Sequence, residues 1–173
     1  MTPLVSNLWP QFMVDPAFAA CFGQVIVEHA QMLRQERQVI FTLRSGAPLD
    51  KNLCARLLAS LQPDYEGFEL RIQNLFGYAM LDETALRDLM EEMKRDGVPI
   101  NGFLDRCKIN IIGQKITIGV CHGTKFLQEM HFEKLLAERI AAHTGVTPQV
   151  TLQSAVSEAE QHQICLLYTS PSP

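Results

Sequence analysis

The sequence predicts an α+β protein made of two small domains, each a helix packed on a three-stranded sheet. Two hairpin patterns support this, because apolar residues alternate around a polar turn near residues 25–43 and again near 108–120. Each pattern is followed by a helical apolar stripe and then by one more alternating segment. The letters do not repeat, but the order strand–strand–helix–strand does.

The first domain is expected to span residues 1–78. Its hairpin is predicted around the polar stretch RQER at 34–37. Leucines at four-residue intervals then predict a helix, which Pro48 can open and Pro63 would end. The segment GFELRIQNLF alternates apolar and polar residues and predicts the third strand.

The second domain is expected to span residues 79–153. Asp82 suits the N-cap of a helix with an apolar stripe, and Gly97 is placed to end it. The stretch VPINGFLDRC predicts a short further helix, and KINIIGQKITIGV predicts a hairpin that turns at Gly113 and Gln114. A single longer helix is expected from about Thr124 to His143, followed by a strand in TPQVTLQ.

Composition restricts the function classes. The net charge of −4 argues against a broad basic surface for nucleic acid. No apolar run has the length of a membrane span, and the N-terminus lacks the pattern of a signal peptide, so a cytoplasmic protein without membrane contact is expected. The five cysteines are scattered and are interpreted mainly as small buried apolar residues.

No catalytic, cofactor-binding or metal-binding residue is assigned from the sequence. It contains no GxxxxGK[ST], GxGxxG, GxSxG or HExxH motif. The one group that could suggest a metal site fits no standard zinc spacing; its members are Cys107, Cys121, His122 and His131. A solvated histidine is the ordinary interpretation of His131.

Charged residues on the predicted helices receive a structural interpretation. Paired carboxylates occur at Glu91 and Glu92 and at Asp64 and Glu66. Glu91 and Glu92 point about 100° apart on a helix and are expected on its solvated face. The turn VCHGTK could place backbone N–H groups and Lys125 near an anion, although a plain strand-to-helix turn is favoured. The charged faces of the helices at 82–95 and 124–143 are the expected contact surfaces.

The order of strands and helices is also KH-like. KH modules clamp nucleic acid with a GxxG loop between helices, and this chain has no GxxG. A free-standing KH-like nucleic-acid-binding protein therefore remains the alternative function.

One long segment carries a family resemblance. The phrases FLDRCKINIIGQKITI and GTKFLQ followed by AERIAAHTG resemble the N-terminal region of PolC-type DNA polymerase III alpha subunits, clostridial members in particular. LWPQF, the hairpin and helix at 25–61, and FELRIQNLF lie where that family has its first small domain, so the resemblance covers about residues 5–155.

The resemblance implies a non-catalytic replisome-interaction region that contacts replisome proteins, including the clamp-loader tau subunit. The parent would be a DNA-directed DNA polymerase that uses Mg²⁺ and proofreads in the 3′-to-5′ direction. Its OB-fold, PHP domain, inserted exonuclease and catalytic acidic residues would lie downstream, so no catalytic residue, no cofactor and no direct DNA contact is expected in this segment.

The last nine residues, CLLYTSPSP at 165–173, have no period and no cap. Written as codons, they resemble a translated transposon end and adapter from a sequencing library. We therefore expect a linker to begin at 154–164, an adapter-derived tail at 165–173, and a truncated gene product.

Overall fold

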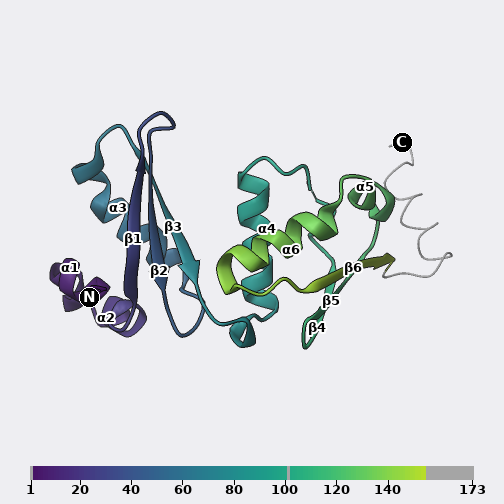
Figure 1. The fold of residues 1–173 in the computed structure, drawn as a ribbon, viewed down its shortest axis with the longest axis horizontal. Coiled ribbons are helices and arrows are strands. Elements are labelled where there is room, and N and C mark those ends of the chain that lie inside the picture. The colour runs from purple at the N-terminus through teal and green to yellow at the C-terminus, as the bar shows by residue number, and fades with distance from the viewer. Residues whose placement is uncertain (1, 101, 155–173) are drawn as a thin grey trace, which may run out of the picture. The chain divides into compact units, whose positions relative to one another are not determined.

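The computed structural model describes residues 2–100 and 102–154, and the chain divides into two compact units between Met80 and Leu81. Each unit combines helices with one three-stranded sheet (Figure 1). The predicted α+β class with two small helix-plus-sheet units is therefore confirmed. Residues 155–164 of the expected linker and the whole expected tail lie outside the described residues, and Ser154 is the last residue of a strand.

Unit 1 begins with short helices and continues with the predicted strand–strand–helix–strand order. Its elements are α1 (Val5–Leu8), the 3-10 helix η1 (Pro10–Val14), α2 (Pro16–Phe22), β1 (Ile26–Leu33), β2 (Gln38–Arg44), α3 (Lys51–Leu61), the 3-10 helix η2 (Gln62–Tyr65), β3 (Glu69–Leu75) and the 3-10 turn η3 (Tyr78–Met80).

Strand β2 is the centre of the first sheet. It pairs with β1 in antiparallel fashion, with a bulge between Val27 and His29, and with β3 in parallel. The parallel pairing requires a crossover, which α3 supplies. The core side of the sheet carries Val39, Phe41 and Leu43, all buried, and the short N-terminal helices pack into the same core.

Unit 2 repeats this arrangement with one more helix in the crossover. Its elements are α4 (Glu83–Arg95), β4 (Lys108–Ile112), β5 (Lys115–Val120), α5 (Thr124–Glu129), α6 (Phe132–Thr144) and β6 (Gln149–Ser154). Strand β5 is central, antiparallel to β4 and parallel to β6. The predicted turn at Gly113 is confirmed, with φ +57° at the glycine.

The ends of α4 follow the capping rules that predicted them. The Asp82 side chain accepts a hydrogen bond from the Ala85 N–H (2.8 Å). At the other end the Val98 N–H donates to the Met93 carbonyl and the Gly97 N–H to the Lys94 carbonyl, which is the Schellman arrangement. The predicted apolar stripe is buried: Leu86, Leu89, Met90 and Met93.

Three expectations about helices are wrong. The single helix from Thr124 to His143 breaks into α5 and α6, because His131 adopts a left-handed conformation (φ +58°). The short helix expected in VPINGFLDRC is a series of turns in its described part. Helix α3 begins at Lys51 and not at Pro48, because Asp50 is its N-cap: the Asp50 carboxylate accepts hydrogen bonds from the N–H groups of Asn52 and Leu53.

An alanine in place of Gly123, between β5 and α5, would cause both backbone strain and a steric clash. Its φ is +80°, and a Cβ there would lie 2.2 Å from the Phe103 ring, which also packs against His122 and Phe126. We expect Gly123→Ala to lower the free energy of unfolding by about 2–3 kcal/mol, from backbone strain plus the clash. Chemical denaturation followed by circular dichroism measures this.

Gly145→Ala is the matched control for that change. Gly145 has φ +75°, but nothing lies within 4 Å of the added Cβ, so only the backbone strain of about 1 kcal/mol remains. Equal losses for the two variants would show that the Phe103 ring moves aside without a loss of stability.

None of the helices in the described ranges is long and apolar enough to cross a membrane.

Candidate interaction site

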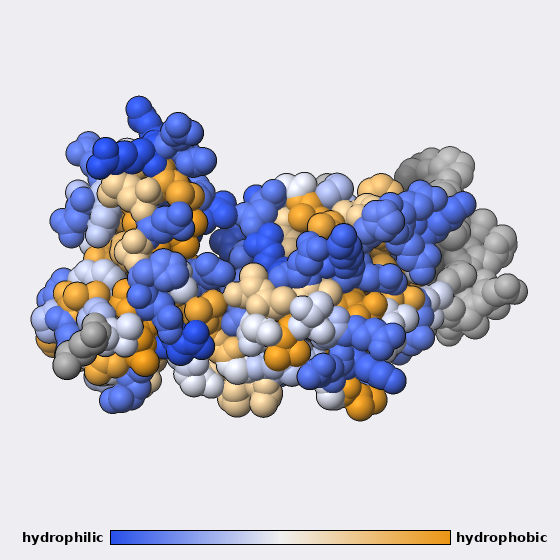
Figure 2. Space-filling view, in the orientation of Figure 1, coloured by the Kyte–Doolittle hydropathy of each residue, from blue (hydrophilic) through white to orange (hydrophobic). Residues whose placement is uncertain are grey.

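A groove lies on unit 1 where η1, α2 and α3 meet. Its volume is about 460 Å³, and it is lined by Gln11, Phe12, Val14, Asp15, Phe18, Arg56 and Ser60. Val14 is 85% exposed, far more than is usual for an aliphatic side chain. In Figure 2 the surface over α1 and α2 mixes apolar and polar residues. The volume falls in the range of ligand pockets, but the groove is open rather than enclosed.

The Asp15 side chain caps α2 and forms an ion pair with Arg56 of α3. One carboxylate oxygen accepts a hydrogen bond from the Ala17 N–H (2.9 Å) and so caps α2, whose first residue is Pro16. The other oxygen accepts from Arg56 Nη2 (3.0 Å). The Ala17 hydrogen bond and then the Arg56 contact lower the pKa of Asp15, so this carboxylate is ionised at neutral pH.

Aromatic rings form the apolar wall of the groove. The Phe18 ring lies 6.2 Å from Phe12 and stacks on the buried Phe22 at 5.6 Å between centroids. The Arg56 guanidinium lies over Phe18, 4.8 Å from the ring centroid. Arg56 is therefore held by a carboxylate and a ring at once, which fixes a cation at the edge of an apolar surface.

The groove offers both apolar and polar contacts for a protein side chain. An apolar residue could cover Val14 and Phe12 while a polar neighbour meets Gln11 or Ser60 on the rim. This site is not predicted from the sequence, because no helix is predicted in residues 1–22. The available signal was Asp15 followed by Pro16, an N-cap residue before a proline at the first helical position.

The predicted contact faces of α4 and α6 are partly engaged within unit 2. Arg139 Nη1 donates to Glu92 Oε1 (2.7 Å) and to Asp96 Oδ2 (2.8 Å), and His143 Nε2 lies 3.4 Å from Glu92 Oε2. The expectation that Glu92 lies on a solvated face is therefore wrong, while Glu91 beside it is exposed.

The same cluster sets a pH dependence. Partial burial alone would raise the pKa of Glu92, but His143 and Arg139 outweigh it and lower that pKa. A carboxyl group with a lowered pKa stabilises the fold above its ordinary pKa, and this stabilisation is lost as the pH falls through the folded value. We expect Glu92→Gln to flatten the decline in unit 2 stability between about pH 5 and pH 3.

Hydrogen exchange of α4 and α6 peptides as a function of pH measures that slope. Glu91→Gln is the control, because Glu91 is exposed on the next position of the same helix and should leave the slope unchanged.

The possible metal ligands occupy separate environments. Cys107 is buried beside Arg87, whose Nη2 donates to the Cys107 carbonyl (2.8 Å), and the Cys121 thiol contacts the Arg106 carbonyl. His122 faces the Phe103 ring, and His131 lies exposed at the α5–α6 break. Within residues 2–100 and 102–154, no three His, Cys, Asp or Glu side chains are grouped as metal ligands.

The cysteines of unit 1 are half-buried rather than fully buried. Burial raises the pKa of Cys54 to about 12, with smaller contributions from Cys21 and Asp50. Burial also raises the pKa of Cys21. Neither thiol is therefore activated as a nucleophile, and Cys107 is the one described cysteine that is fully buried as predicted.

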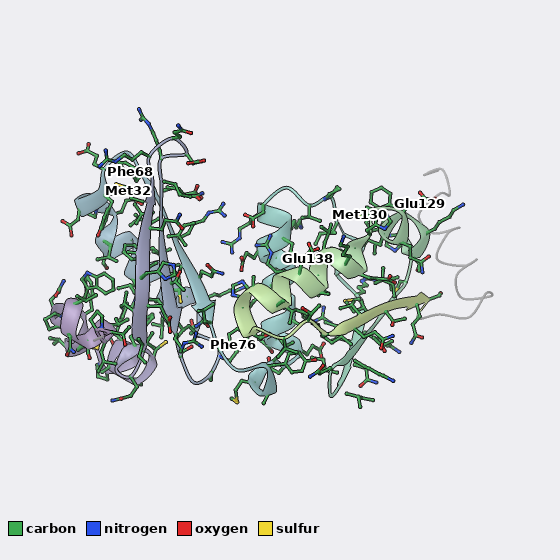
Figure 3. The ribbon with its side chains drawn as sticks, in the orientation of Figure 1. Met32, Phe68, Phe76, Glu129, Met130 and Glu138 are labelled. Carbon is green, nitrogen blue, oxygen red and sulfur yellow. The ribbon has the colours of Figure 1, made fainter. Side chains whose placement is uncertain are left out.

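The turn VCHGTK leads into α5, a helix of six residues whose N-cap Gly123 provides no side-chain hydrogen bond. Such a short helix does not make an anion site by itself. The α5–α6 junction is where a KH module would carry its GxxG loop. Figure 3 labels Glu129 and Met130 there, and the junction continues with His131 and Phe132, so it contains no glycine.

Comparison with known proteins adds no relative: no family model, no curated protein and no solved structure matches the chain.

Proposed function

We propose that this chain is the non-catalytic N-terminal region of a PolC-type DNA polymerase III alpha subunit and that it binds replisome proteins in the cytoplasm. The observation that carries the proposal is the phrase FLDRCKINIIGQKITI together with the helix segment that follows it. Template-directed synthesis with Mg²⁺ and 3′-to-5′ proofreading would then belong to downstream domains of the parent protein.

The groove on unit 1 supports protein binding as the role of this region. The phrase LWPQF, which belongs to the resemblance, contributes Gln11 and Phe12 to its lining. Exposed apolar side chains with polar residues on the rim are typical of protein interfaces. The clamp-loader tau subunit is the proposed partner.

The alternative is a free-standing KH-like nucleic-acid-binding protein. The order α4–β4–β5–α5–α6–β6 favours it, since two helices lie between the central strand and the last one. The glycine-free junction at Met130 and His131 argues against it, because a backbone clamp needs close approach to phosphates.

A binding comparison tests the proposal. The 173-residue chain should bind a clostridial tau subunit and should show no salt-dependent micromolar binding to single-stranded oligonucleotides. Val14→Asp in the groove should weaken tau binding about tenfold, whereas Met80→Asp, an equivalent change at an exposed methionine outside the groove, should not. Oligonucleotide binding without tau binding would support the KH-like alternative instead.

The source DNA provides a second check. Reading past the codon for Ile164 should show a frame that continues into exonuclease and polymerase motifs. A stop codon directly after TSPSP would contradict the assignment to a polymerase.

A further inference from the structure

The two sheets share one topology, so the faces that point away from their helices can be compared. On the first sheet this face carries charges of both signs, and they are paired. Arg44 contacts Glu28 at the bulge, and Arg71 Nε lies 3.4 Å from Glu69 Oε1. The outer face of sheet one is therefore neutralised by its own residues.

The outer face of the second sheet differs in charge. Ile116, Ile118 and Leu152 are buried on the helix side. Alternation then places a set of polar residues with one isoleucine on the other side: Lys108, Asn110, Ile112, Lys115, Thr117, Gln149, Thr151 and Gln153. This set, the basic outer face, has two lysines and no carboxylate, in a chain whose net charge is −4.

Both lysines are available to a partner. Lys108 and Lys115 are exposed, and no ion pair within the described part of the chain engages either side chain. Figure 2 shows a mainly hydrophilic surface over the β4–β5 hairpin with a small apolar area. Ile112, at the end of β4, is 68% exposed.

The two edges of this sheet are also unequal. At the β6 edge, the Leu152 N–H donates to Glu133 Oε1 of α6 (3.0 Å), so a side chain occupies part of that edge. At the β4 edge, no hydrogen bond from another element of the described ranges reaches residues 108–112. Ile109 and Ile111 on its helix side are only half-buried, so the core is open there.

We propose that β4 binds an extended acidic segment of a partner protein as an additional strand. Backbone hydrogen bonds to the β4 edge would supply affinity, and alternate side chains would supply specificity. Carboxylates would lie on the side of Lys108 and Lys115, and apolar side chains on the side of Ile109 and Ile111. The inference rests on the proposed function in one respect, that the partner is a protein.

The geometry fits a short segment of alternating acidic and apolar residues. Strand β4 has five residues, so the added strand would pair over a similar length. Strands lie about 4.8 Å apart, which places a carboxylate beside Lys108 and about two strand spacings from Lys115, within reach of a lysine side chain.

Other occupants fit less well. The basic outer face has no aromatic residue on which a base could stack, and two lysines neutralise few phosphates. A second copy of the chain would extend the sheet with two more lysines and no carboxylate, so charge opposes β4–β4 pairing.

The test uses the 173-residue chain and a capped, fluorescein-labelled peptide of alternating glutamate and valine. Anisotropy should show binding at about 50 mM salt that weakens at about 500 mM. The same peptide with glutamine in place of glutamate should bind at least about tenfold more weakly. Hydrogen exchange should slow at residues 108–112 when the acidic peptide is bound.

Paired variants localise the effect. Lys108→Glu combined with Lys115→Glu should weaken binding about tenfold or more, whereas Lys134→Glu, at an exposed lysine of α6, should change it less than about twofold. The milder double variant, Lys108→Gln with Lys115→Gln, should also weaken peptide binding. It replaces the glutamate variant if charge reversal disturbs folding.

Several outcomes would overturn the inference: no binding of the acidic peptide, equal binding of the glutamine peptide, unchanged binding by the lysine variants, protection outside β4, or self-association of the chain through this edge. Tau binding without peptide binding would remove the β4 site and leave the proposed function intact. Peptide binding without tau binding would support the β4 site and contradict the proposed function.

Discussion

Phe22→Ala should lower the free energy of unfolding of unit 1 by about 4 kcal/mol. Phe22, the last residue of α2, is fully buried in the core of unit 1 and stacks on Phe18 at 5.6 Å between ring centroids. Truncation would remove a large apolar contact area and leave a cavity that the packed neighbours fill only in part. Urea titration followed by fluorescence measures the loss, since Trp9, the sole tryptophan, packs edge-on against Phe41 in the same core.

Two further variants make that result interpretable. Phe22→Leu retains most of the apolar volume and should cost about 1–2 kcal/mol, which keeps a folded population if the alanine variant unfolds completely. Val14→Ala, at an 85% exposed position, should change stability by less than about 0.5 kcal/mol. A Phe22→Ala loss as small as the Val14→Ala loss would contradict the core position of the ring.

Arg139→Met should lower the stability of unit 2 by about 2 kcal/mol. The guanidinium bridges Glu92 and Asp96 from α6 to α4, and its removal leaves two carboxylates close together without their cation. Breaking a fully buried ion pair costs about 3–5 kcal/mol, but these side chains are 22–30% exposed, so water compensates in part. Hydrogen exchange of peptides from α4 and α6 measures the change.

Arg95→Met is the control for the arginine change. Arg95 is exposed in the last turn of α4, and no ion pair among residues 2–100 and 102–154 engages it, so only the loss of its helix-dipole interaction, about 0.3–0.5 kcal/mol, is expected. If both substitutions had the same small effect, the Arg139 cluster would contribute no more than ordinary surface charges.

The strands and the capped helix α4 were predictable because their signals are local. The Gly113 turn and the Asp82 cap each depend on residues within a few positions of one another. In β3 the alternation predicted the strand but not its burial, because Leu70 alone is buried and the five residues after it are half-buried on both faces. The repeated strand–strand–helix–strand order followed from these pieces.

The broken helix was not predictable, because its cause lies in tertiary contacts. Apart from Glu129 and Glu133, the apolar arc from residue 124 to 143 fits one helix, yet Phe132 begins a separate helix and is fully buried. Glu133, which interrupts the arc in the sequence, accepts a hydrogen bond from the edge of β6. A polar residue in an apolar stripe thus had a partner that sequence periodicity does not identify.

The candidate groove could be predicted even less. It combines Asp15 with Arg56, a pair separated by 41 positions, over an aromatic wall. Composition gives no indication that these residues meet. The two N-terminal helices that line the groove, η1 and α2, have five and seven residues and are too short for a periodic signal. A single sequence does not show which residues far apart along the chain contact each other in the fold.

The position of the parallel strand has a consequence for synthesis of the chain on the ribosome. Gln38 in the central strand β2 pairs with β1 at once, but its partner Glu69 in β3 is 31 residues further along. At about 5–20 residues per second, that stretch takes roughly 2–6 s to translate. For those seconds the nascent hairpin has one edge of its most apolar strand without a partner, and unit 2 goes through the same stage with β5 and β6. Nascent-chain chaperones would therefore have their main substrate in this protein at the two hairpins, each before its third strand is made.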